Sequence, residues 1–277
     1  MLVSFKEILD MAEKGNFAIP AFNVYNMETV MGVIRAAERQ NAPVILQNYS
    51  RLVTNEEGYY LAPIILAAAE KASVPVCYHL DHGASEVEVM RCIRYGATGI
   101  MIDKSALSIE ENIAATKNVV ELCDAVGVAV EGEIGHVGSA ANGDEQTTEY
   151  TTVEEAKTFV EGTGVAALAI AVGTAHGRYK KAPKLAIERI AEIHKEVDVA
   201  LVLHGGSGVP DEEIKASIAA GIRKINFGTD LCYAFLDQVF ATSREKIGID
   251  TFMKEAVEAV AAFADEKIKL LGADNKA

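Results

Sequence analysis

The chain of 277 residues has no long apolar run and only four cysteines. No uninterrupted apolar stretch approaches the roughly 20 residues that a membrane-spanning helix needs, which disfavours insertion into a bilayer. The first residues, MLVSFKEILDMAEKG, have the pattern of an amphipathic helix rather than that of a signal peptide. The cysteines show neither CxxC spacing nor the density of a disulfide scaffold. These features predict a location in the reducing cytoplasm.

Positive charge is also scarce. The sequence has 26 lysines and arginines against 40 aspartates and glutamates, which gives a formal net charge of −14. This excess of negative charge would repel a phosphate backbone, so nucleic acid is not an expected partner. A small phosphate is still an expected ligand, because a few backbone N–H groups and one lysine can form a local anion site in an acidic protein.

Eight short apolar runs alternate with amphipathic helical stretches along the chain. This alternation predicts an α/β fold, a parallel (β/α)8 barrel, whose usual length is about 250 residues. No Pro/Ser-rich linker interrupts it, so we predict one domain over residues 1–277. Residues 135–152, rich in Gly, Ala, Thr and Asn, are predicted to form a mobile active-site loop. The predicted strands are 18–24, 43–48, 74–80, 98–103, 127–134, 166–173, 199–205 and 222–227.

Polar residues that could bind a metal occur where these predicted strands end. Asp81 and His82 end the third strand, Glu133 the fifth and His204 the seventh, while His176 follows the sixth. The carboxyl ends of barrel strands converge on one face, so these side chains are expected to meet. Three imidazoles and a carboxylate are suitable ligands for a catalytic Zn²⁺ with an open position. Each histidine taken alone could instead be a hydrogen-bonded strand-end residue.

Three glycine-rich turns follow the late strands, at 173–180 (GTAHGRYK), 204–208 (HGGSG) and 226–230 (NFGTD). Barrels often bind phosphate after their seventh and eighth strands, where glycine lets backbone N–H groups approach an anion. The turns therefore predict a phosphate site beside the metal ligands. Tight βα turns also need glycine for purely conformational reasons, so one such turn alone is weak evidence.

These motifs, in this order and over nearly the whole length, resemble those of the class II fructose-bisphosphate and tagatose-bisphosphate aldolase family. The matching stretches are PAFNV with Asn23, HLDHG with Asp81 and His82, VEGEIG with Glu133, GTAHG with His176, LHGGSG with His204, and KINFGTD with Asn226.

The resemblance implies a role for each metal-site residue. His82, His176 and His204 would be zinc ligands, Glu133 an alternate or outer ligand, and Asp81 the acid/base at the C4 hydroxyl of a ketose phosphate. General chemistry agrees, because cleaving the C3–C4 bond develops negative charge on the ketone oxygen, which a divalent Lewis acid can stabilise. A carboxylate must also take the C4 hydroxyl proton, and Asp81 lies next to a ligand.

The resemblance also implies a substrate site for dihydroxyacetone phosphate, in which Asn226 lies near the reacting carbons. It further implies a monovalent cation near the phosphate and a homodimer or homotetramer. The residues implied to bind substrate or phosphate are Asn23, Gly177, Lys180, Gly205, Ser207, Asn226, Gly228 and Thr229.

The loop after the fifth strand departs from the family pattern. Family members commonly have GGxED there, whose Glu handles a proton on the ketose-phosphate half, but this chain has Ala141 and Asn142 at the matching positions. Asp144 or Glu145 could replace that residue, although either could equally be a solvated loop charge.

The part of the predicted site that would bind the aldehyde half of the substrate also departs from the family pattern. The TSPG-like segment expected after the second strand reads NYSR, which introduces Tyr49 and Arg51, and the late Arg that often contacts a distal phosphate aligns with Val257. Arg51 or Arg178 could supply another anion contact, or could face solvent. We therefore predict an aldolase that keeps the dihydroxyacetone phosphate side and has an altered aldehyde side.

Other readings stay open on the sequence alone. A Schiff-base aldolase would need a partly desolvated lysine at a strand end, and Lys104 in MIDKS is a candidate. The changed loop is also compatible with a phosphate-binding homologue that does not catalyse. A zinc hydrolase is less favoured, because the sequence shows no other obvious base to activate water. A purely structural zinc site is also less favoured, because it would more often use cysteine ligands.

Overall fold

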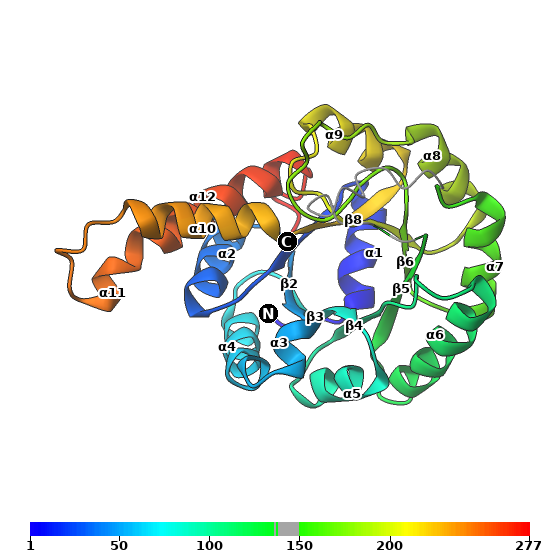
Figure 1. The fold of residues 1–277 in the computed structure, drawn as a ribbon, viewed down its shortest axis with the longest axis horizontal. Helices are drawn as coiled ribbons and strands as arrows, with labels where there is room; N and C mark the ends of the chain where they lie inside the picture. The colour runs from blue at the N-terminus through cyan, green and yellow to red at the C-terminus, as the bar shows by residue number, and fades with distance from the viewer. Residues whose placement is uncertain (136, 138–149) are drawn as a thin grey trace.

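The computed structural model describes residues 1–135, 137 and 150–277. Eight parallel strands pair in chain order, and β8 pairs with β1 to close the barrel (Figure 1). This confirms the predicted (β/α)8 barrel. The strands are β1 Ile19–Asn23, β2 Val44–Tyr49, β3 Val76–Gly83, β4 Gly99–Ile102, β5 Ala129–Ile134, β6 Ala167–Ile170, β7 Ala200–Leu203 and β8 Ile222–Phe227.

The position at which each strand ends determines whether a site residue lies on the strand or on the turn that follows it. β3 continues past its predicted end at residue 80, so Asp81 and His82 are part of the strand. β6 and β7 end three or two residues earlier than predicted, and this leaves His176 and His204 on the turns that follow them. The strands are buried along almost their whole length, as expected for a parallel sheet covered on both faces.

The helices start where capping residues satisfy free backbone N–H groups. Ser4, Asn26, Ser108 and Thr152 each accept a bond from the third helical residue, whose side chain bonds back to the cap. The helices are α1 Phe5–Gly15, α2 Met27–Gln40, α3 Ser50–Thr54, α4 Glu57–Lys71, α5 Glu86–Arg94, α6 Ile109–Asp124, α7 Val153–Thr163, α8 Ile187–Glu196, α9 Asp211–Ala220, α10 Thr229–Ala241, α11 Ile249–Phe252 and α12 Lys254–Leu270. Among the described residues, no helix is long and apolar enough to cross a bilayer.

Helix α1 lies across the amino-terminal opening of the barrel (Figure 1). Its Phe5 ring contacts the imidazole of His79 in the barrel interior, with the ring centroids 4.5 Å apart. Gly99 on β4 makes room for this contact, because a Cβ there would lie within 3 Å of both rings. The interior is therefore closed at this end, and the opposite end carries the site.

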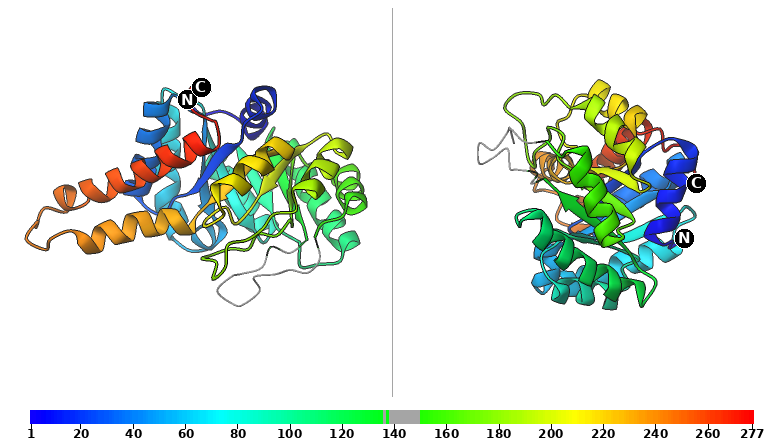
Figure 2. Two further views of the ribbon diagram at one scale, coloured as in Figure 1. Left: turned by 90° about the horizontal axis from the view of Figure 1, so that it is seen from above. Right: turned by 90° about the vertical axis from the view of Figure 1, so that its right-hand side faces the viewer.

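Helices α10, α11 and α12 form an arm that projects from one side of the barrel (Figures 1 and 2). The base of the arm is fixed because α12 packs along α2, where Arg35 and Arg39 form ion pairs with Glu258 and Asp265. The far part of the arm carries exposed apolar side chains: Phe240, Ile247 and Ile249 are 82%, 91% and 76% exposed. The arm therefore offers an apolar surface away from the barrel.

Candidate active site

A cavity of about 610 Å³ opens at the carboxyl ends of the strands. It contains most of the residues predicted to form the metal and substrate sites, which come from β1, β3, β8, the turns after β6 and β7, and the start of α10. Those among its lining residues are Asn23, Asp81, His82, His176, Gly177, Gly205, Ser207, Asn226, Gly228 and Thr229. Side chains far apart in the sequence thus meet on the predicted face.

The three histidines lie around one point. The ring centroids are 4.7 Å apart for His82 and His204, 4.9 Å for His82 and His176, and 5.9 Å for His176 and His204. One ring nitrogen from each lies within 4.8 Å of the others, which is compatible with a shared metal ion. The spatial convergence expected from the sequence is therefore present.

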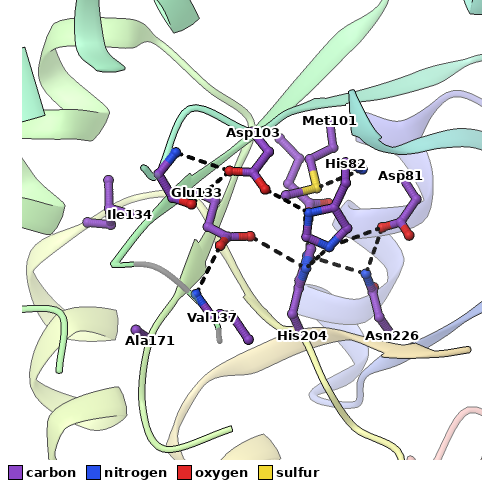
Figure 3. Close-up of polar contacts among 12 residues, drawn as sticks. Asp81, His82, Met101, Asp103, Glu133, Ile134, Val137, Ala171, His204 and Asn226 are labelled. Atoms are coloured by element: carbon purple, nitrogen blue, oxygen red, sulfur yellow. Dashed lines mark hydrogen bonds and ion pairs between the residues drawn. The ribbon is translucent and has the colours of Figure 1, made fainter. Parts of the chain in front are cut away.

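In both His82 and His204, the ring nitrogen that points away from the other histidine contacts a carboxylate. His82 Nδ1 lies 2.9 Å from Asp103 Oδ2 (Figure 3). His204 Nε2 lies 2.8 Å from Glu131 Oε1. If each imidazole donates to its carboxylate, His82 Nε2 and His204 Nδ1 present lone pairs to each other across 3.0 Å. Such facing lone pairs repel each other, and a cation between them would bind both. The donor set therefore fits a divalent metal, with Asp103 and Glu131 orienting the ligands.

The electrostatics of the cluster also favour positive charge at its centre. Burial lowers the pKa of His82, but Asp81, Asp103 and Glu133 more than reverse this effect and raise it to about 10. Burial and the neighbouring His82 lower the pKa of His176 to about 4. The carboxylates around His82 thus favour a positive charge on this side of the cluster.

His82 has a backbone conformation that is unusual for a residue other than glycine. Its φ of +50° lies in the left-handed region, which β-carbon sterics disfavour. Its backbone N–H points to Met101 Sδ at 3.4 Å. Strain of this kind is frequent at functional sites, where the surrounding structure fixes one side-chain direction.

Glu133 lies beside the histidine cluster and belongs to a second possible ligand set with His82 and Asp103. Its Oε2 is 3.6 Å from His204 Nδ1, and Oε1 accepts a hydrogen bond from Val137 N at 3.4 Å. Burial and the nearby Asp103 raise the pKa of Glu133 to about 8. This position suits the alternate or outer ligand expected from the sequence.

Three amide side chains hold the Asp81 carboxylate. Asn23 Nδ2 donates to its Oδ2 at 2.7 Å, while Gln47 Nε2 and Asn226 Nδ2 donate to its Oδ1 at 3.2 Å. Asp81 Oδ1 lies 3.9 Å from His82 Nε2. The carboxylate is therefore fixed next to the candidate metal position and lines the cavity.

The predicted phosphate residues are brought together, with one exception. Gly177 and Gly205 adopt φ values of +102° and +67°, and a side chain at Gly205 would collide with the Ala175 backbone, so these turns require glycine. Tyr179 Oη accepts from Ala175 N and donates to Gly205 O, which ties the two turns together. Lys180 is exposed and is not among the residues that line the cavity.

The remaining candidates lie in three different places. Arg51 lines the cavity from α3, directly after β2. Lys104, the Schiff-base candidate, donates its Nζ to Ala84 O at 2.5 Å and is not among the lining residues. Glu145 and most of its predicted loop lie outside the described residues.

Sequence reasoning missed a buried network beneath the cluster. Lys224 Nζ lies 2.8 Å from Glu131 Oε2 and donates to Asn226 Oδ1 at 2.8 Å, and both Lys224 and Glu131 are fully buried. The sequence did contain a signal, because Glu131 and Lys224 stand two residues before Glu133 and Asn226. Alternate residues of a strand share a face, so both had to point inward.

The fold and these convergent side chains define a barrel enzyme with a candidate metal centre. The family is that of the class II fructose-bisphosphate aldolases, to which the chain belongs: the family's sequence profile matches residues 3–276. This confirms the resemblance and identifies the protein as a lyase of the aldolase type.

Individual relatives cover the whole chain. It is 36% identical to the sulfofructosephosphate aldolase of Alkalicoccus urumqiensis, over 99% of this chain and 98% of that protein. It is 39% identical to the protein YdjI of Escherichia coli (strain K12), over 100% of both. The crystal structure of the YdjI aldolase from that organism covers 100% of both chains with a TM-score of 0.91 and 38% identity. Fructose-bisphosphate aldolase from Campylobacter jejuni matches with a TM-score of 0.85 at 25% identity, over 100% of this chain and 97% of that one.

Proposed function

We propose that this protein is a divalent-metal aldolase that reversibly cleaves a ketose 1-phosphate, or a ketose 1,6-bisphosphate, to dihydroxyacetone phosphate and an aldehyde. The observation that carries the proposal is the meeting of His82, His176 and His204 beside Asp81 in one cavity. The names of the relatives agree, since one acts on a sulfofructose phosphate and another on fructose bisphosphate.

His82, His176 and His204 would hold the metal, with Glu133 as an alternate or outer ligand. Zn²⁺ is the proposed ion, because imidazole and carboxylate donors suit it. When bound, it would supply a Lewis acid for the charge that develops on the ketone oxygen.

Asp81 is the proposed catalytic base. It takes the proton of the C4 hydroxyl as the C3–C4 bond breaks, so that C4 becomes the aldehyde carbon and the bonding electrons stay on C3. The amides of Asn23, Gln47 and Asn226 keep the carboxylate aimed at that hydroxyl. A proton must then reach C3, and assigning this transfer to Asp144 or Glu145 stays a prediction.

The turns after β7 and β8 are the proposed phosphate site. Gly205, Ser207, Gly228 and Thr229 line this side of the cavity together with Gly177 from the turn after β6. Backbone N–H groups at such turns bind an anion without needing a surplus of positive side chains. Phosphate contact by Lys180 and a nearby monovalent cation remain predictions.

A coupled assay for dihydroxyacetone phosphate tests the proposal. Metal-loaded protein should release it from at least one ketose phosphate, lose this activity with a chelator, and recover it with Zn²⁺ or another divalent ion. Tight binding of ketose phosphates without any turnover would indicate a binding protein instead. Activity that resists the chelator but is trapped by borohydride would indicate a Schiff base.

We also propose a single domain over residues 1–277 that forms a homodimer or homotetramer in the cytoplasm. Phe240, Ile247 and Ile249 support the oligomer, because exposed apolar side chains grouped on a projecting arm are typical of protein interfaces. The four cysteines are all free, as is usual in a reducing compartment.

A further inference from the structure

Besides Asp81 and the proposed phosphate turns, the cavity is lined by Tyr49 at the end of β2, Ser50 and Arg51 at the start of α3, and Ala84 after β3. These residues form a wall that follows β2 and β3, whereas the phosphate turns follow β7 and β8 on the other side of β1 in the barrel. A ketose 1-phosphate with its phosphate at the β7 and β8 turns and its C4 hydroxyl at Asp81 would therefore direct its far end towards this wall.

Arg51 is the only lysine or arginine among the described residues that line the cavity. Within the described part of the chain, its guanidinium makes no ion pair or side-chain hydrogen bond, and its CZ lies 5.9 Å from the centre of the Tyr49 ring. The two carboxylates that line the same cavity have other partners, since Asp103 bonds to His82 and Asp81 to three amides. The hydrogen-bond donors of Arg51 are thus available to a ligand.

Helix α3, which carries Arg51, is held in place by hydrogen bonds to α5. Arg91 on α5 donates to the carbonyl oxygens of Val53 and Thr54 on α3 at 2.9 and 3.2 Å, and Thr54 Oγ1 bonds to Glu88 at 3.2 Å. These contacts fix the backbone of α3 while the Arg51 side chain stays at the cavity mouth. The arginine is therefore presented to the cavity on a fixed support.

We propose, building on the aldolase function above, that Arg51 binds an acidic group at the far end of the ketose 1-phosphate. The planar guanidinium fork pairs with the oxygens of a phosphate, sulfonate or carboxylate through two charge-assisted hydrogen bonds. The enzyme then favours substrates whose aldehyde product is itself an anion. Arg51 is a specificity residue in this scheme, and the bond-breaking chemistry stays with Asp81.

The test compares ketohexose 1-phosphates of both C4 configurations that differ only at C6. The four C6 groups are hydroxymethyl, phosphate ester, sulfonate and carboxylate. Wild type should show a kcat/KM for at least one anionic substrate about 10- to 100-fold above the hydroxymethyl substrate, the range expected for charged hydrogen bonds. The anionic substrate with the highest kcat/KM identifies the acidic group that the site prefers.

Variants of Arg51 test whether its guanidinium causes the preference for anionic substrates. Arg51→Ala should lower the ratio of anionic to neutral kcat/KM by about the same 10- to 100-fold factor. Arg51→Lys should restore part of it, because a lysine keeps the charge but loses the fork. The control is Arg94→Ala, an exposed arginine on α5 that does not line the cavity and should leave the ratio unchanged.

Each failure has a distinct signature. If wild type cleaves neutral and anionic substrates equally well, or if Arg51→Ala lowers both by the same factor, the role of Arg51 is refuted and the aldolase function stands. If metal-loaded wild type cleaves no ketose 1-phosphate at all, the proposed function fails, and the inference fails with it.

Discussion

The buried Glu131–Lys224 pair allows a prediction that separates folding from metal binding. Replacing Lys224 with Met leaves the Glu131 carboxylate fully buried without its counter-charge, 2.8 Å from where the ammonium stood. Breaking such a pair costs about 3–5 kcal/mol, a large share of the 5–15 kcal/mol that typically stabilises a folded protein. Glu131→Met should cost a similar amount, because it leaves the Lys224 ammonium buried and unpaired.

The double variant Glu131→Met/Lys224→Met should be much more stable than either single variant. Replacing both charges with apolar groups of similar volume removes the unpaired charge and is often neutral for stability. His204 Nε2 nevertheless loses its acceptor in the double variant, so the ring is no longer held with Nδ1 towards the metal. We expect its metal affinity to fall by about 10- to 100-fold, the usual effect of removing a ligand's hydrogen-bond partner.

The assays are urea unfolding of metal-free protein and competition for Zn²⁺ with a chromophoric chelator. A matched control is Arg223→Met, which removes the neighbouring β8 residue whose Nε pairs with Glu13 at 2.9 Å outside the cluster. It should lower stability and leave metal affinity unchanged. Wild-type metal affinity in the double variant would show that Glu131 does not orient His204, and a cost below about 1 kcal/mol for either single variant would contradict the burial argument.

Three other predictions use different measurements. Asp81→Ala should lower turnover about 10²- to 10⁴-fold while metal content stays at the wild-type level, and near-normal turnover would remove Asp81 from the chemistry. Adding Zn²⁺ at 100 times its dissociation constant to stripped protein should stabilise the fold by about 2.7 kcal/mol in a thermal melt, whereas no shift would contradict a native-state metal site. Phe240→Asp should shift the mass measured by light scattering towards the monomer, because it places a charge on the exposed apolar part of the arm; an unchanged mass would exclude that surface from the interface.

The barrel and the main cluster could be predicted because both follow from local patterns. Apolar runs alternating with amphipathic stretches predict parallel strands, and the closure of eight strands brings their carboxyl ends together. His82, His176 and His204 could therefore be expected to meet although they are far apart in the sequence. The strand bounds were less accurate; the apolar run of β6, for example, continues through Ala171 and Val172 into the turn that follows.

The supporting network could not be derived in the same way. Glu131 and Lys224 come from β5 and β8, which are not neighbours in the barrel, so their contact depends on how the interior is filled. The pairing of Asp103 with His82 likewise depends on the register shift between β3 and β4 near Gly83. Helical periodicity in the last 50 residues indicates helices but does not say that α10 and α12 leave the barrel as an arm.

The left-handed backbone of His82 has a consequence for engineering this enzyme. Glycine, and to a lesser degree asparagine, accepts that conformation more readily than histidine does. A library of metal-free protein sorted only for heat resistance would therefore tend to lose the imidazole at this position and enrich inert proteins. Selection schemes need a catalytic readout from the first round, because thermal tolerance and turnover demand different residues at the same site.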